Sequence, residues 1–227
     1  MKEPNRRDLA AEEARNRILV AAADCIVRDG LVNVRMAGIA RAAGVSSGLV
    51  HYHFATKEQL FTEVLSHSSA VSNALTEQAL ERAGTQPAQR LSTFLDRCLP
   101  SDELLIHDWR LWQELDLLCL RQPDLAQVGA EVYETIYASV TDIITAGIES
   151  GVFDLDPAAA RSMAETAVGL CDGLGARVVA PGPDLPLAVA RSMVAHAVGR
   201  LVGHDGPLPP PVTGTKKKKG RRAWTSA

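Results

Sequence analysis

A short polar stretch between residues 46 and 57 carries the side chains best suited to contact a polyanion. It offers hydroxyls, imidazoles, a phenol and an ammonium group beside a glycine: Ser46, Ser47, Gly48, His51, Tyr52, His53 and Lys57. Hydroxyls and backbone N–H groups at a helix N-terminus bind phosphates, and a glycine allows a backbone to approach closely. These residue types therefore predict contacts with phosphates or base edges.

A metal site is the other chemistry that His51 and His53 suggest. On a helix, two residues separated by two positions point about 200° apart, so one ion does not readily bind both. The four cysteines lie far apart with no C-x-x-C spacing, at positions 25, 98, 119 and 171. We therefore expect no metal and no cofactor, and a reducing cytosol is the simpler compartment for these thiols.

Two short helices are expected to position the polar stretch. The first spans about 36–43 and ends at Gly44. The second begins at Ser46 or Ser47, both good N-cap residues, and ends near Phe54. Two short helices joined by such a tight turn form a helix-turn-helix pattern, and an apolar seam between them is available from Ile39, Ala40, Val45 and Val50.

A longer helix follows the pattern. Thr56 is its expected N-cap, and Gln59 stands at the spacing of a capping box. Lys57 in its first turn is either a phosphate contact or a solvated lysine. His53 either contacts nucleic acid or packs at the helix end, and Phe54 is expected in the core.

At these positions the sequence resembles the N-terminal DNA-binding domain of TetR-type transcriptional regulators. The resemblance runs in unbroken order through Arg28-Asp29-Gly30, Ile39-Ala40, Ala43-Gly44-Val45-Ser46, Gly48, Tyr52-His53-Phe54 and Lys57-Glu58-Gln59-Leu60. The helix with Trp109 and Trp112, which ends in Arg121-Gln122-Pro123, is similar to the C-terminal domains of the BetI-like subgroup. The resemblance implies a homodimeric, all-α repressor with its recognition helix in the major groove and a ligand in its C-terminal domain.

Two positions depart from that family pattern. The family often has Thr or Ser where Val34 and Arg35 stand. Asn33 is therefore expected to cap the first helix of the motif, and Arg35 to reach a phosphate. The family often has Tyr where His51 stands, and a histidine there can still hydrogen-bond a phosphate or a base edge. DNA binding is expected to survive with a different operator preference.

A second group of residues could bind a small molecule. Trp109, Trp112 and Asp116 recur at helical spacing and are expected to share one helix face. Two aromatic rings and a carboxylate can hold an organic cation through cation–π and charge contacts, and core packing of the tryptophans is the alternative. Adjacent helices could add Tyr133, Tyr137 and Asp172.

Charge supports the same ligand class. Residues 61–204 carry 19 Asp and Glu against 9 Lys and Arg. An acidic domain disfavours an anionic effector, so a cationic or neutral amphiphile is expected.

The last two helices, expected over 157–180 and 185–203, are rich in Gly and Ala. Glycine destabilises a helix by roughly 1 kcal/mol relative to Ala, so close helix–helix approach is the expected compensation. The resemblance makes these helices a dimer interface, and a monomer core is the alternative. The apolar residues expected at the interface are Met163, Leu170, Leu174, Val178, Val189, Met193 and Leu201.

The 227-residue chain is expected to be all-α, because strand patterns are almost absent and helical spacing recurs throughout. Its expected parts are a helix-turn-helix domain over 1–60, a ligand-binding and dimerisation domain over 61–204, and a disordered basic tail over 205–227. Further helices are expected at 87–99, 103–121 and 124–150. The run Lys216–Arg222 either solubilises the chain or binds phosphates nonspecifically.

These observations predict a cytoplasmic, DNA-binding repressor that a small molecule releases from a palindromic operator. The sequence contains no run of 18 apolar residues that could span a membrane, and its N-terminus has no apolar stretch typical of a secretory signal. Two alternatives remain, a helical enzyme and a small-molecule-binding protein whose helix-turn-helix contacts other proteins. The enzyme is disfavoured because the sequence shows no nucleophile–base pattern, zinc spacing or Gly-rich phosphate loop.

Overall fold

The computed structural model describes residues 6–120, 123–180, 182 and 185–213. In these residues the regular secondary structure is entirely helical, which confirms the expected all-α class. No helix among them combines the length and the apolar character that crossing a membrane requires.

The helices form two compact units, each built from separate stretches of the chain. Among the described residues, unit 1 contains 6–71, 110–120 and 123–129. Unit 2 contains the remaining described residues, from 72–109 and from 130 onward. The expected boundary near residue 60 divides the chain linearly, whereas three of its helices contribute residues to both units.

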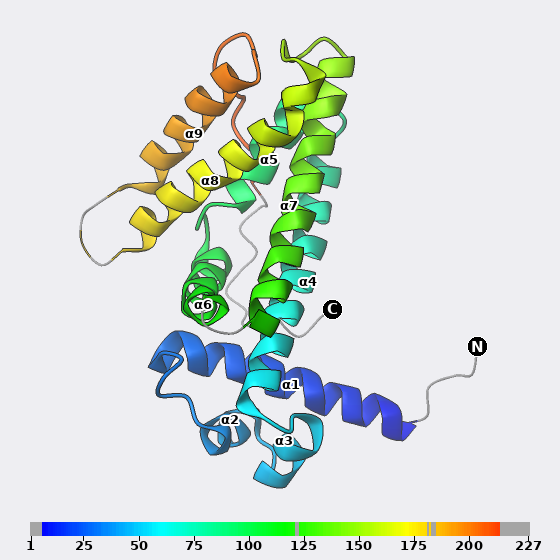
Figure 1. Ribbon diagram of the computed structural model, residues 1–227, viewed down its shortest axis with the longest axis vertical. Helices are drawn as coiled ribbons and strands as arrows, with labels where there is room; N and C mark the ends of the chain where they lie inside the picture. The colour runs from blue at the N-terminus through cyan, green and yellow to red at the C-terminus, as the bar shows by residue number, and fades with distance from the viewer. Residues whose placement is uncertain (1–5, 121–122, 181, 183–184, 214–227) are drawn as a thin grey trace. The chain divides into compact units, whose positions relative to one another are not determined.

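Unit 1 begins with three helices and the first part of a fourth. They are α1 (Arg6–Asp29), α2 (Met36–Ala43), α3 (Ser47–His53) and α4 (Lys57–Ala83). The two short helices α2 and α3 follow each other across a tight turn (Figure 1). Burying one apolar stripe of each helix makes the core, which includes Ile18, Leu19, Ile26, Ile39, Val50, Phe54, Leu60 and Leu65.

Two later helices complete the core of unit 1. These are α6 (Glu103–Cys119) and α7 (Pro123–Glu149). Leu111 and Leu115 from α6 and Leu125 from α7 are at most 1% exposed and belong to the same apolar cluster as α1 to α4. The helix-turn-helix therefore shares its core with residues more than fifty positions further along the chain.

Unit 2 contains α5 (Pro87–Arg97), a 3-10 turn at Pro157–Ala159, α8 (Ala160–Val179) and α9 (Leu187–Leu201). Helices α8 and α9 lie side by side, and both contact α5 (Figure 1). Their apolar faces and that of α7 form one core, which includes Leu91, Leu95, Val140, Ile144, Val168, Cys171, Val194 and Val198.

The start of the expected disordered tail is ordered, so the prediction of disorder is wrong for residues 205–213. Leu208 is 4% exposed and belongs to the core of unit 2. Its backbone N–H donates a hydrogen bond to the Ala195 carbonyl at 3.0 Å. The low number of apolar residues predicts disorder, but Leu208 is buried and the backbone of this segment hydrogen-bonds to the rest of unit 2. The basic run Lys216–Arg222 lies outside the described residues.

Candidate functional site

Local backbone signals set the turn between α2 and α3. Gly44 adopts a left-handed conformation with φ of 67°, which ends α2. The Val45 N–H then donates to the Ala40 carbonyl at 3.0 Å. Ser46 caps α3, because its hydroxyl accepts the Leu49 N–H at 3.2 Å. The helix-turn-helix expected from the sequence is confirmed.

The seam beneath the turn is apolar, as expected. Ile39, Val50 and Phe54 have no exposed surface, and Ala40 is 2% exposed. Val45 packs half-buried against the same core. This packing holds α3 rigidly, so the residues on its outer side have a defined position.

The outer side of the turn and of α3 is exposed and polar. It consists of Ser46, Ser47, Gly48, His51 and Tyr52, which we call the reading face. Tyr52 leaves 78% of its surface exposed. A side chain at Gly48 would meet only the Ser46 hydroxyl, at 3.8 Å, so no packing within the chain requires a glycine there. Gly38, on α2, likewise faces open space and was not singled out from the sequence.

His53 does not belong to the reading face. It is half-buried, and its Nε2 atom is buried with no hydrogen-bond partner in the described structure. The imidazole packs edge-on against Tyr52, at 5.2 Å between ring centres, and contacts Phe54. Of the two alternatives for His53, packing at the helix end is the one that this placement favours. Among the described residues, no cluster of three metal-ligating side chains is present.

The turn between α1 and α2 is held from both sides at Leu31. The Lys57 ammonium donates to the Leu31 carbonyl at 3.2 Å and lies over the Phe61 ring at 5.2 Å. The Glu114 carboxylate accepts the Leu31 N–H at 2.9 Å. The sequence assigns no role to Glu114, because Glu114 is 83 residues from Leu31 along the chain and no local signal links the two residues.

The expected cap at Asn33 is wrong. Arg35 is the N-cap of α2, with extended backbone and no side-chain hydrogen bond to the helix. Asn33 instead donates from its amide to the Asp29 carbonyl at 2.9 Å. The end of α1 leaves carbonyls without helical partners, and Asn33 is close enough to satisfy one of them. Arg35 itself is exposed.

In unit 2, three of the expected ligand residues come together. The Tyr133 hydroxyl donates to the Asp172 carboxylate at 3.4 Å, and the Tyr133 and Tyr137 rings lie 5.7 Å apart. The Arg161 guanidinium lies 5.0 Å from the centre of the Tyr137 ring and forms ion pairs with Glu134 and Glu165. Burial raises the pKa of Tyr137, and the negative charge of Asp172 raises it further. Tyr133 therefore contacts the Asp172 carboxylate, Tyr137 stacks beside Tyr133, and both tyrosines are half-buried.

Trp109 belongs to the same unit. Its indole N–H donates to the Cys98 carbonyl at 3.2 Å, and its ring lies so close to Gly175 that a side chain there would collide with it. Gly175 stands one turn along α8 from Asp172, so the indole lies near the carboxylate. Burial raises the pKa of the Cys98 thiol to about 12, and the Asp172 charge contributes to the rise. Trp109, Tyr133, Tyr137 and Asp172 thus form what we call the aromatic–carboxylate cluster.

Trp112 and Asp116 belong to unit 1, whereas Trp109 belongs to unit 2. The three residues expected to bind one ligand are therefore divided between the units. The indole of Trp112 packs against the core of unit 1. Asp116 is exposed, although nearby protein atoms raise its pKa by desolvation. Helical spacing correctly placed these residues on one helix, but α6 contributes its first turns to one unit and its last turns to the other.

The expected dimer residues differ in exposure. Val189 and Met193 are 45% exposed and Leu201 is 36% exposed, all on α9. Met163, Leu170 and Val178 are half-buried on α8. The expectation of an interface position is wrong for Leu174, which is only 7% exposed and packs in the core of its own unit. On the open side of α8, side chains at Gly169 and Gly173 would meet nothing within 4 Å.

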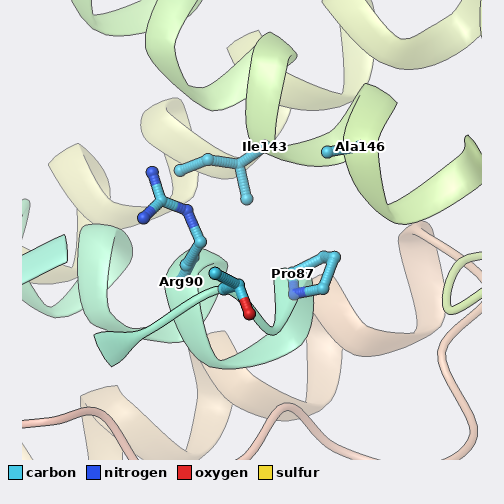
Figure 2. A pocket seen from close by; sticks show the side chains of 5 residues that line it. Pro87, Arg90, Ile143 and Ala146 are labelled. Atoms are coloured by element: carbon cyan, nitrogen blue, oxygen red, sulfur yellow. The ribbon is translucent and has the colours of Figure 1, made fainter. Parts of the chain in front are cut away.

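A small pocket in unit 2 lies apart from these residues. Figure 2 shows Arg90 and Pro87 of α5 opposite Ile143 and Ala146 of α7, and Thr85 completes the lining. Its volume is about 180 Å³, below the roughly 300 Å³ at which ligand pockets usually begin. Arg90 also donates to the Leu80 and Gly84 carbonyls, so it serves the end of α4. None of the expected ligand residues lines this pocket.

An exposed reading face on a capped, rigidly packed helix-turn-helix, within an all-helical chain, defines a DNA-binding regulator. Residues 18–64 match the family described as bacterial regulatory proteins, tetR family. Residues 87–203, just over half of the chain, match the family described as BetI-type transcriptional repressor, C-terminal. The chain belongs to the tetR family of transcriptional regulators, with a C-terminal region of the BetI type.

Individual relatives agree with this assignment. The chain is 28% identical over 191 residues to the HTH-type transcriptional regulator BetI of Agrobacterium fabrum, covering 82% of this chain and 87% of that protein. A regulator from Saccharomonospora viridis, solved in complex with choline, is 26% identical with a TM-score of 0.74, covering 86% and 98% of the two chains. A TetR-family regulator from Rhodococcus sp. is 25% identical with a TM-score of 0.72, covering 85% and 99%.

Proposed function

We propose that the chain is a homodimeric repressor that acts in the cytoplasm, without catalysis, and leaves a palindromic operator when an organic cation binds in unit 2. The exposed reading face of α3 carries the proposal. Its side chains are exposed, whereas Ile39, Val50 and Phe54 beneath them are fully buried. Such a face suits a partner with its own surface of donors, acceptors and charge, which duplex DNA provides.

Each residue of the reading face has a distinct proposed role. Ser46 and Ser47, at the N-terminus of α3, bind phosphate oxygens through hydroxyl and backbone N–H groups. Gly48 lets the helix backbone come close to the groove wall. His51 and Tyr52 extend to base edges or phosphates, and Arg35 adds a phosphate contact from the start of α2.

Lys57 has a proposed double role. Its ammonium carries three hydrogens, and the hydrogen bond to Leu31 uses one of them. A phosphate contact is compatible with that bond, so Lys57 can hold the turn before α2 and also bind the DNA backbone.

The proposed dimer is formed by the open sides of α8 and α9. Val189, Met193 and Leu201 provide exposed apolar surface, and Gly169 and Gly173 allow another helix to approach α8 closely. A two-fold dimer presents two identical reading faces, so its operator has two symmetric half-sites.

The proposed effector site is the aromatic–carboxylate cluster. Arg161 already covers one face of the Tyr137 ring. The rings of Trp109 and Tyr133, beside Asp172, suit a quaternary or substituted ammonium group through cation–π and charge contacts. A related regulator from Saccharomonospora viridis has been solved in complex with choline. This supports an organic cation as the effector class, and it makes choline a suitable first probe.

Two helices provide a route from effector to DNA. The helix α6 carries both Trp109 and Glu114, and α4 begins with Lys57. Glu114 and Lys57 both hold Leu31 at the start of the helix-turn-helix. A ligand that binds the DNA-competent and DNA-incompetent dimers with different affinity would shift their balance, and a coupling of about 1–3 kcal/mol is typical.

A direct test combines operator binding with a cation titration. Gel shifts with DNA upstream of the chain's own gene should show a specific complex, and choline should release it. Asp172→Asn should weaken the choline response about tenfold without changing operator affinity. Asp142→Asn, an exposed carboxylate on α7, is the matched control and should change neither. A choline response that is unaltered in Asp172→Asn would reject the proposed effector site.

A further inference from the structure

The chain continues beyond α9 as an ordered strap, which we define as residues 204–213. This segment follows the part of the chain matched by the BetI-type family, which ends at residue 203. Gly203 has φ of +67°, and a side chain added there would collide with the Asp154 carbonyl. The His204 N–H then donates to the Gly199 carbonyl at 2.9 Å. The chain therefore turns sharply after α9 and runs back across unit 2.

In the central part of the strap, every backbone N–H group finds an acceptor on α5 or α9. Residues 207–212 read Pro-Leu-Pro-Pro-Pro-Val, so Leu208 and Val212 hold the two backbone N–H groups. The Leu208 N–H donates to the Ala195 carbonyl of α9 at 3.0 Å. The Val212 N–H donates to the Thr93 hydroxyl of α5 at 3.1 Å. Because proline fixes φ, these four prolines also reduce the conformational freedom that docking must remove.

The helix α5 presents a matching polar row to the strap. Gln89 donates to the Pro210 carbonyl at 2.7 Å, and Ser92 donates to the Pro209 carbonyl at 2.5 Å. Thr93 completes the row as the acceptor for the strap. Ser92 is 7% exposed and Thr93 is 1% exposed, so these hydroxyls are buried and take their partners from the strap. The row therefore recognises the carbonyls and N–H of an extended backbone.

The apolar part of the contact has one anchor. Leu208 is 4% exposed and belongs to the core of unit 2. Gly199 makes room for it, because a side chain there would stand 2.7 Å from the Gly206 carbonyl oxygen and 3.2 Å from the Leu208 nitrogen. One buried leucine between backbone contacts is the pattern of a peptide bound to a receptor surface.

We propose that α5 and α9 form a peptide-binding site whose ligand is the chain's own strap, residues 204–213. The strap is covalently attached but separable, and it is recognised by its backbone and by Leu208. The site is distinct from the reading face and from the aromatic–carboxylate cluster, and the proposal does not depend on what either of them binds.

Two shortened chains test the proposal. One ends at Gly203 and lacks the strap. The other ends at Gly214, so it keeps the strap and lacks only residues 215–227, which include the basic run. The melting temperature of the chain ending at Gly203 should be roughly 5–15 °C lower than that of the chain ending at Gly214, because Leu208 is buried. Equal melting temperatures would overturn the proposal.

Binding in trans is the sharper measurement. A fluorescein-labelled peptide of residues 204–214 should bind the chain ending at Gly203, as followed by anisotropy, and should not bind the chain ending at Gly214, whose site is occupied. A Leu208→Ala peptide should bind at least tenfold more weakly. An Asp205→Asn peptide, altered at an exposed residue, should bind like the original. Equal binding of the Leu208→Ala peptide, or equal binding to both chains, would contradict the proposal.

If the chain ending at Gly203 does not fold, the intact chain provides the measurement. The Leu208 and Val212 amides should be protected from hydrogen exchange in the full-length protein. Leu208→Ala should reduce the protection of both amides at least tenfold, whereas Asp205→Asn should not. Unprotected Leu208 and Val212 amides would show that the strap is not docked.

Discussion

The two units present their candidate functional residues in opposite ways. In unit 1, Tyr52 exposes most of its surface, and a side chain added at Gly48 would meet only the Ser46 hydroxyl. In unit 2, Tyr133 and Tyr137 are half-buried, and Tyr133 bonds to Asp172 within the chain. A DNA duplex is too large to enter a protein, so its contacts must stand outside. A small cation is held more tightly where water is partly excluded. The difference in exposure therefore matches the difference in partner.

The two regions also differ in how they are assembled. The reading face comes from consecutive residues of one capped turn and helix. The aromatic–carboxylate cluster takes Trp109 from α6, its tyrosines from α7 and Asp172 from α8. A substitution in the first region should therefore alter binding while leaving the fold intact, whereas one in the second should also affect stability.

The largest effect is expected at the proposed dimer face, the exposed apolar surface of α9 in unit 2. Met193→Asp should raise the dimer dissociation constant at least 100-fold, about 3 kcal/mol, because the interface would bury an unpaired charge. Sedimentation should show a wild-type dimer at micromolar concentration and a folded monomer for the variant. Ala138→Asp, on the exposed side of α7, is the control. A dimer that tolerates Met193→Asp would move the interface elsewhere.

The next effect concerns the reading face. Tyr52→Ala should weaken operator binding about 10- to 100-fold, as expected for a contact worth about 1–3 kcal/mol. The melting temperature should not change, because the side chain is 78% exposed. Leu120→Ala, at an 83% exposed position of unit 1, should leave operator binding unchanged. Fluorescence anisotropy with labelled operator provides the measurement, and equal affinities for Tyr52→Ala and wild type would remove Tyr52 from the contacts.

Two helical glycines compare the units directly. Gly175→Ala should lower the melting temperature by several degrees, because the added methyl group displaces the Trp109 ring, at a typical cost of about 1–3 kcal/mol. Gly48→Ala should keep or raise the melting temperature but weaken operator binding, because its space is open in the free chain. Calorimetry should show a lower melting temperature only for Gly175→Ala. Anisotropy should show the weaker operator binding of Gly48→Ala. The same response from both glycines would contradict the distinction between the units.

A smaller effect is expected at the turn before α2. Lys57→Ala should weaken binding several-fold for all DNA sequences and reduce the salt dependence by about one phosphate contact. Glu114→Ala, which removes the other partner of Leu31, should weaken binding without changing the salt dependence. Titrations at several salt concentrations separate these outcomes. If Lys57→Ala leaves the salt dependence unchanged, Lys57 only positions the turn.

The smallest effect is a pH dependence of unit 2. Burial raises the pKa of Cys98 from 9.0 to about 12, so the folded state keeps the thiol protonated when the unfolded chain loses its proton. This contribution to stability is complete below about pH 9 and is lost as the pH rises toward 12. Urea unfolding at pH 8 and pH 10 should show a smaller loss of stability in Cys98→Ala than in wild type. An identical loss in both would show that Cys98 is not the titrating group.

Many features of the fold could be predicted because their causes are local. Gly44 and Ser46 mark the ends of α2 and α3 in the sequence, since left-handed backbone and capping involve neighbouring residues. The cap at Thr56 was also predictable, and its hydroxyl accepts the Gln59 N–H at 3.0 Å. Exposure of Tyr52 follows once α3 and its apolar seam are known.

Long-range packing settled the remainder. Helical spacing places Trp109, Trp112 and Asp116 on one helix, but their surroundings depend on which distant residues pack against each turn of α6. Leu174 looked like an interface residue because its own core partners lie elsewhere in the chain. The strap looked disordered because its stability depends on Leu208, and on hydroxyls of α5 more than a hundred residues earlier. Composition and local spacing describe what a segment offers, whereas burial depends on which surfaces the rest of the chain brings to it.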